Sequence, residues 1–133
     1  MMDSLFERML KGAEPCVRIA EDRAHAAILE PCPTAEGHAV IFTKKKIDAF
    51  FDLTPEDLAA FMAFAQKIAA AMKEAVPCDK IAIVVYGLKV RHAHMHLIPA
   101  RGTEGEIRLD KPRAQAPEAV LADIGSRIRA SIK

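Results

Sequence analysis

Three of the five histidines of the chain alternate with apolar residues in the stretch His92-Ala93-His94-Met95-His96-Leu97-Ile98-Pro99. Successive side chains of a β-strand point to opposite faces of the sheet, so His92, His94 and His96 would share one face. Neighbouring Cα atoms in such a row are roughly 6–7 Å apart. The residues between them would face a core. A row of imidazoles is a poor solution for packing, so the pattern indicates chemistry.

Two kinds of chemistry fit the row. A zinc site uses His-x-His on a strand with a third histidine, but an extended strand separates His92 from His96 by about 13 Å. The motif also has no carboxylate or thiolate in or beside it. In the second kind, one histidine attacks phosphorus and its neighbours stabilise the charge on the phosphoryl oxygens. Scattered surface histidines would not explain the regular spacing.

The composition predicts a single globular domain covering residues 1–133. The chain is long enough to bury a core, 51% of its residues are hydrophobic, and its net charge is +1. This balance of charge gives no reason to expect a nucleic-acid or membrane partner. The start of the sequence lacks the features of a signal peptide, and three widely spaced cysteines are expected to be reduced thiols. We therefore expect a cytoplasmic protein.

The elements that would position the histidines follow from the hydrophobic pattern. A capping box at Ser4-Leu5-Phe6-Glu7 predicts a short helix over residues 5–11. Strands are expected over residues 17–20, 24–29 and 38–42. Residues 81–86 are almost all apolar, which predicts a strand buried on both faces. The histidine row follows after five residues, so these two strands should form an antiparallel hairpin.

A long helix is predicted from Pro55 to Val76, with Thr54 as its N-cap. Its apolar stripe should consist of Leu58, Phe61, Met62, Ala65, Ile68, Ala69 and Met72. Phe64 lies about 100° from the centre of this stripe, which leaves it free to face a partner subunit. A C-terminal helix should pack through Val120, Leu121, Ile124 and Ile128.

These elements predict an α+β fold with an antiparallel sheet of about five strands, a long helix and a C-terminal helix. The polar segment from Ala100 to Ala116 is long for a loop, and segments of this kind tend to be lids, interface elements or disordered.

The histidine row and its surroundings resemble the histidine-triad (HIT) family of nucleotide hydrolases and transferases. His92 to Ile98 follows the signature of that family, in which apolar residues separate and follow three histidines. The resemblance extends over roughly residues 4–100 and is greatest to the Hint-type branch of small bacterial-like members. It implies the HIT-like fold, a homodimer, and a small-molecule purine nucleotide as substrate.

The resemblance also implies roles for the histidines. His94 would attack the α-phosphorus of the nucleotide, and water would then release the nucleoside monophosphate from a nucleotidyl-histidine intermediate. His92 and His96 would help to hold and neutralise the phosphate, and His38 matches a fourth histidine near it. His25 has no counterpart and is expected to be structural.

Relatives of the Hint type bind the purine between the first helix and the first hairpin. This carries over to Leu5, Phe6, Met9 and Ile28, which the hydrophobic pattern alone would place in a core. Glu30 stands where relatives place Asp or Asn on the ribose hydroxyls, and it keeps the acceptor chemistry with a longer side chain.

Two departures concern the phosphate and the metal. Leu88 and Lys89 stand where relatives have Gln and Ser or Thr, so one amide contact is missing and Lys89 is a candidate for binding near the leaving group. Ser4 and Glu7 replace the two cysteines of zinc-binding bacterial members. We therefore expect neither a metal nor another cofactor.

Three functions remain in competition. The first is a phosphoramidase or dinucleoside polyphosphate hydrolase, and the second is a nucleotide-binding module with little turnover, for which Leu88 is the main support. The third and weakest is a metal-dependent hydrolase on the histidine row. The leaving group, the preferred base and the pathway do not follow from the sequence.

Overall fold

The computed structural model of the chain describes residues 2–102, 107 and 113–133. Its centre is a five-stranded antiparallel sheet in the order β1-β2-β3-β5-β4. The strands are β1 (Arg18–Glu21), β2 (His25–Leu29), β3 (Ala39–Thr43), β4 (Lys80–Val84) and β5 (His94–Ala100). β4 and β5 form the expected hairpin, and β5 pairs with β3 on its other side. The predicted α+β class is therefore confirmed.

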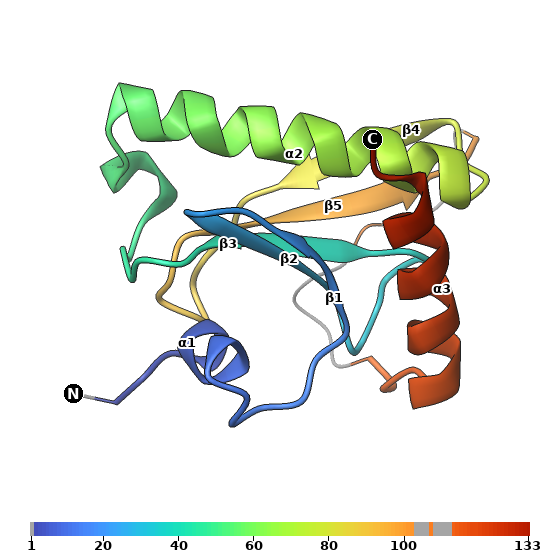
Figure 1. Cartoon of the computed structure of the whole chain (residues 1–133), viewed down its shortest axis with the longest axis horizontal. Helices are drawn as coiled ribbons and strands as arrows, with labels where there is room; N and C mark the ends of the chain where they lie inside the picture. Colours follow the sequence, from blue (N-terminus) through green and yellow to red (C-terminus); the bar gives the residue numbers. More distant parts are fainter. Residues whose placement is uncertain (1, 103–106, 108–112) are drawn as a thin grey trace.

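Helices lie on both faces of this sheet (Figure 1). The long helix α2 (Pro55–Ala75) and the C-terminal helix α3 (Glu118–Ser131) cover one face and enclose the larger core. The short helix α1 (Leu5–Leu10) lies on the other face and encloses a smaller core. Phe6 of α1 stacks on Phe42 of β3, with ring centroids 4.5 Å apart.

The alternation of side chains along the strands decides which residues face α1. In β3, Ile41 belongs to the core beneath α2 and α3, whereas Val40 and Phe42 belong to the core beneath α1. The pairing of β3 with β5 places His94 opposite Phe42 and His96 opposite Val40. Both histidines therefore face the α1 side of the sheet.

The helix boundaries agree with the signals in the sequence. The backbone N–H of Asp57 donates to the hydroxyl of Thr54 at 3.1 Å, so Thr54 is the N-cap of α2. The last helical residue is Ala75, and Val76 is the C-cap. At the start of the chain, Ser4 and Glu7 form the predicted capping box of α1.

Two expectations for the helices are wrong. Phe64 is 8% exposed and stacks on His25, so it is not available to a partner, whereas Met62 of the predicted stripe is 41% exposed. Phe64 thus belongs to the face of α2 that packs on the sheet, because its ring lies on His25 of β2. On α3, Val120 is 47% exposed, and Gly125 is buried beside Leu121, Ile124 and Ile128.

The expectation that residues 81–86 form a strand buried on both faces is also wrong. β4 is one of the two edge strands of the sheet, and among the described residues it pairs with β5 alone. Ile83 is 52% exposed and Tyr86, beyond the end of the strand, is 58% exposed. An apolar run cannot reveal whether a second strand or helix covers it, because that depends on the tertiary arrangement.

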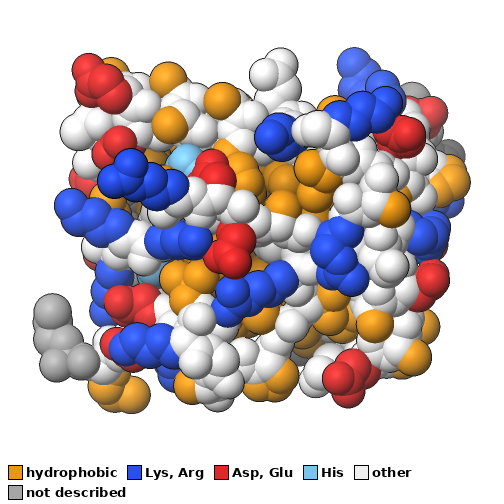
Figure 2. Space-filling view, viewed as in Figure 1, with side chains coloured by type: hydrophobic (Ala, Val, Ile, Leu, Met, Phe, Trp, Pro, Cys, Tyr) orange, Lys and Arg blue, Asp and Glu red, His pale blue; other side chains and the backbone are white. Residues whose placement is uncertain are grey.

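Three expectations concern the segment of residues 100–116, the surface charge and the absence of a membrane partner. Part of the segment between Ala100 and Ala116, residues 103–106 and 108–112, lies outside the described residues. On the face shown in Figure 2, basic and acidic side chains are interspersed, which agrees with the net charge of +1. Within the described part of the chain, no helix has the length and apolar character that crossing a membrane requires.

Candidate active site

A cavity of about 790 Å³ lies between α1, the α1 face of the sheet and the segment of residues 86–90. Eight of the residues expected at the site line it together, and they come from four separate parts of the chain. These are Leu5, Phe6, Met9, Ile28, Glu30, Lys89, His94 and His96. The predicted purine pocket and two of the three alternating histidines therefore share one cavity.

His94 is the first residue of β5, and its imidazole is held by the backbone. Its Nδ1 lies 2.6 Å from the carbonyl oxygen of His92. A carbonyl oxygen can only accept, so Nδ1 carries the hydrogen and Nε2 carries a lone pair. Burial lowers the pKa of His94 below its ordinary value, which keeps the ring neutral at pH 7. His94 thus has the protonation state of a nucleophile.

His96 is part of a chain of hydrogen bonds that begins in the loop before β3. The backbone N–H of Thr34 donates to Nδ1 of His38 at 3.1 Å, so the hydrogen of His38 is on Nε2. Nε2 of His38 lies 2.9 Å from Nδ1 of His96 and donates to it. The hydrogen of neutral His96 must then be on Nε2. His96 therefore presents an N–H donor beside His94, whose ring centroid lies 5.3 Å away.

The same two histidines are held neutral. Burial, followed by electrostatic interaction with His96 and with the Arg113 charge, lowers the pKa of His38 to about 3. Burial, followed by His94 and Arg113, lowers the pKa of His96 to about 4. His38 itself lies under the cavity wall rather than in it, at 1% exposure. Gly37 precedes it with φ +85°, and a side chain at Gly37 would meet Val76.

His92 is not in the cavity wall and lies before the strand, although its ring contacts Phe6 and Phe42 and so lies on the α1 side of the sheet together with His94. β5 begins at His94, because residues 87–93 turn before the strand starts. The His92 ring is completely buried, and its Nε2 donates to the carbonyl oxygen of Thr43 at 2.6 Å. Its Nδ1 accepts from the Ser4 hydroxyl at 2.7 Å. Since the His92 carbonyl holds His94, His92 supports the site from beneath.

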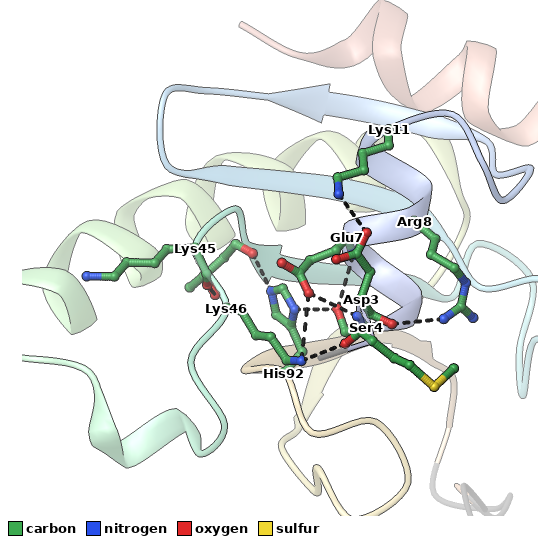
Figure 3. Close-up of polar contacts among 10 residues, drawn as sticks. Asp3, Ser4, Glu7, Arg8, Lys11, Lys45, Lys46 and His92 are labelled. Atoms are coloured by element: carbon green, nitrogen blue, oxygen red, sulfur yellow. Dashed lines mark hydrogen bonds and ion pairs between the residues drawn. The ribbon is translucent and has the colours of Figure 1, made fainter.

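Ser4 and Glu7 surround the His92 ring at the start of α1 (Figure 3). The backbone N–H of Glu7 donates to the Ser4 hydroxyl at 3.1 Å, and the Ser4 N–H donates to the Glu7 carboxylate at 2.9 Å. The Lys46 ammonium lies 3.8 Å from the same carboxylate. One carboxylate beside an ammonium does not suit a divalent cation. Across the described ranges, no group of three or more His, Cys, Asp or Glu is arranged to hold a metal ion.

Glu30 has a partner that the sequence did not reveal. Its Oε1 lies 3.4 Å from Nη2 of Arg113, and Nε of Arg113 donates to the carbonyl oxygen of Cys32 at 2.6 Å. Both side chains are largely buried and line the cavity. Burial raises the pKa of Glu30, and the Arg113 charge opposes that rise. A lone arginine in a polar segment carries no local signal of its position, so sequence reasoning missed it.

His25 is outside this arrangement, as expected. It is 4% exposed, its Nδ1 lies 3.0 Å from a carboxylate oxygen of Asp22, and its ring contacts Phe61 and Phe64 of α2. These contacts place His25 on the face of the sheet opposite the cavity.

The HIT domain model matches residues 11–103, which is more than half of the chain. The fold and the histidine arrangement agree with that match. The protein belongs to the histidine-triad (HIT) family.

Individual relatives give the same result. An HIT-like protein of Mycobacterium tuberculosis is 31% identical over 105 residues, which cover 75% of this chain and 73% of the relative. The adenosine 5'-monophosphoramidase of Schizosaccharomyces pombe is 26% identical over 138 residues, which cover 99% of this chain and all of the relative. The crystal structure of an HIT-like protein of Bartonella henselae superposes with a TM-score of 0.86, at 27% identity and 98% and 96% coverage.

Proposed function

We propose that the protein is a nucleotide hydrolase or transferase that acts on the α-phosphate of purine nucleotides. The substrates would be nucleoside phosphoramidates or dinucleoside polyphosphates. The observation that carries the proposal is the pairing of two neutral imidazoles in one cavity: His94 with a lone pair on Nε2 and His96 with a hydrogen on Nε2. The name of the fission-yeast relative, a phosphoramidase, supports the first substrate class.

In the proposed reaction, Nε2 of His94 attacks the α-phosphorus, so that an N–P bond forms and the bond to the leaving group breaks. Nε2–H of His96 donates a hydrogen bond to the phosphoryl group, and the leaving group takes its proton from solvent water. The His94 ring becomes cationic when both of its nitrogens are substituted, and the His92 carbonyl stabilises it by accepting from Nδ1. Water then attacks phosphorus, the N–P bond breaks, the nucleoside monophosphate leaves with neutral His94 restored, and the proton of the attacking water passes to solvent.

Binding of the nucleoside would rest on the walls of the cavity. The purine would lie against Phe6, with Leu5, Met9 and Ile28 around it. Glu30 contacts Arg113 through one carboxylate oxygen, and the other would accept from a ribose hydroxyl. Lys89, which is exposed at the cavity wall, would attract the leaving side of the substrate.

The proposal is tested with an adenosine phosphoramidate substrate. The wild type should turn it over, and His94→Ala should lose turnover while still binding AMP, because the purine pocket remains. Acid quench of a single turnover with labelled adenylyl substrate should recover label on the protein through an acid-labile N–P bond. Turnover by His94→Ala at the wild-type rate would show that His94 is not the nucleophile.

One observation favours a second function, a nucleotide-binding module with little turnover. Leu88 lines the cavity beside Lys89, and its side chain offers no hydrogen-bond donor to a phosphate or leaving group. This function predicts that AMP binds to both proteins while wild type and His94→Ala are equally inactive.

We also infer that the protein is a cytoplasmic homodimer. Phe64 is buried and no longer supports a dimer. The dimer is supported instead by the exposed apolar side chains along the β4 edge, which include Ile83 and Tyr86. Sedimentation at micromolar concentration should give twice the monomer mass, and a monomer would exclude this part of the proposal.

A further inference from the structure

The histidines of the site cannot provide the positive charge that a bound phosphate requires before the reaction. The pKa values of His38, His92, His94 and His96 are all lowered, in each case chiefly by burial. The four rings are therefore neutral at pH 7, where a nucleoside monophosphate carries between one and two negative charges. Neutral imidazoles donate or accept hydrogen bonds but supply no net charge. The countercharge must come from another group.

Two cations line the cavity within the described part of the chain, Lys89 and Arg113. Lys89 is exposed, so water screens its charge. Arg113 has 19% of its side chain exposed, and its charge contributes to lowering the pKa of both His38 and His96. Its guanidinium therefore lies within electrostatic range of the imidazoles at which the reaction would occur.

Contacts with the loop before β3 and with the end of β2 help to hold the Arg113 guanidinium in place. Nε donates to the Cys32 carbonyl at 2.6 Å, and Nη2 lies 3.4 Å from Glu30. Cys32 belongs to the loop that precedes β3, the same loop in which Thr34 contacts His38. Arg113 is thus attached to the loop that orients the His38–His96 pair. A guanidinium presents its donors in a rigid planar fork, which fits the oxygens of a phosphate.

We propose that Arg113 binds the α-phosphate of the nucleotide, and that Glu30 and the Cys32 carbonyl position it for this role. The proposal rests on the proposed function, since it concerns a nucleotide in the same cavity. It assigns to Arg113 the phosphate contact that the Leu88 side chain cannot make, and it gives Glu30 a positioning role besides any contact with ribose.

The experiment compares the binding of AMP and adenosine, which differ only in the phosphate, by calorimetry. For Arg113→Gln we expect AMP affinity to fall about tenfold to a hundredfold, the range for one charge-assisted hydrogen bond, with adenosine affinity unchanged. The AMP affinity of Arg113→Lys should lie between those of the wild type and Arg113→Gln, because lysine keeps the positive charge and loses the planar fork of donors. Raising the salt concentration should weaken AMP binding by the wild type more than by Arg113→Gln.

Arg127→Gln is the matched control. Arg127 lies on α3, outside the cavity, and contacts the carboxylates of Asp123 and Glu36. This variant should keep the wild-type ratio of AMP to adenosine affinity. The ratio also corrects for general damage, because a distorted cavity would weaken both ligands. If Arg113→Gln lowers both affinities equally, or neither, Arg113 does not bind the phosphate.

Failure of this inference can be distinguished from failure of the proposed function. An unchanged affinity ratio in Arg113→Gln, with normal turnover of phosphoramidate by the wild type, would overturn the Arg113 role and leave the hydrolase intact. A second combination of results is possible: Arg113→Gln loses the preference for AMP over adenosine, and the wild type shows no turnover. That combination would confirm the phosphate contact and favour the binding module.

Discussion

Burial of His38 as a neutral base should make the stability of the protein depend on pH. The pKa of His38 is lowered from 6.5 to about 3 in the folded chain, at 1% exposure. Between these values the unfolded chain binds a proton that folded His38 does not, so unfolding takes up a proton. Stability from this group is therefore complete above pH 6.5 and decreases as the pH falls toward 3. From pH 7 to pH 5 the decrease works out at about 2 kcal/mol.

The variant His38→Gln isolates this effect. A glutamine can accept from the Thr34 N–H and donate to His96, so the hydrogen bonds are kept while the titrating group is removed. The variant should lose about 2 kcal/mol less than the wild type between pH 7 and pH 5. Comparing the two losses, rather than the absolute stabilities, cancels any general cost of the substitution.

Urea titrations at several pH values between 5 and 7 would measure the effect. The chain has no tryptophan and one tyrosine, so far-UV circular dichroism is the suitable probe. Because the pKa of His96 is about 4, the free energy of unfolding should decrease further as the pH falls, and by the same amount in both proteins. Equal losses of free energy in the wild type and in His38→Gln would refute the conclusion that folded His38 is a neutral, buried base.

Three further outcomes are expected. Because the pKa of His94 is lowered, kcat/KM should stay constant as the pH falls from 7 through 6.5 and decrease only below that; an acid limb centred at or above 6.5 would contradict a buried neutral nucleophile. Ser4→Ala should lower the unfolding free energy by about 2–4 kcal/mol and also reduce kcat, because it removes an N-cap and leaves His92 Nδ1 unsatisfied. Thr54→Ala, the matched control at an exposed cap, should lose about 1 kcal/mol and keep kcat, and equal effects on kcat would exclude a positioning role for Ser4. Activity should survive prolonged treatment with EDTA, and stoichiometric zinc that is lost together with activity would support the metal-dependent hydrolase instead.

The features that the sequence predicted well depend on local signals. The capping residues Ser4 and Thr54 mark their helices, and strand alternation places His94 and His96 on the same face. The four apolar residues proposed to hold the purine follow from the resemblance to relatives, because the hydrophobic pattern alone assigns them to a core. The structure places them in the cavity wall beside the two histidines.

The features that were missed depend on contacts between distant segments. Phe64 is buried because its ring stacks on His25 of β2, a residue 39 positions earlier, and no signal within α2 indicates that contact. Ile83 is exposed because β4 is at an edge, a property of strand order rather than of the strand. His92 leaves the strand because of the turn before it, and Arg113 reaches Glu30 across 83 positions of sequence.

The walls of the cavity divide along the boundary of the family match, which runs from residue 11 to residue 103. All four central histidines lie inside this interval, whereas Leu5, Phe6, Met9 and Arg113 lie outside it. The residues proposed to react thus lie inside the matched interval, and several of those proposed to contact the base and the phosphate lie in its two flanks. On these proposed roles, exchanging the flanks with those of a relative should change the ligand preference and leave the reaction in place. For the same reason, a truncation at the amino terminus that removes Leu5, Phe6 and Met9 would alter the cavity.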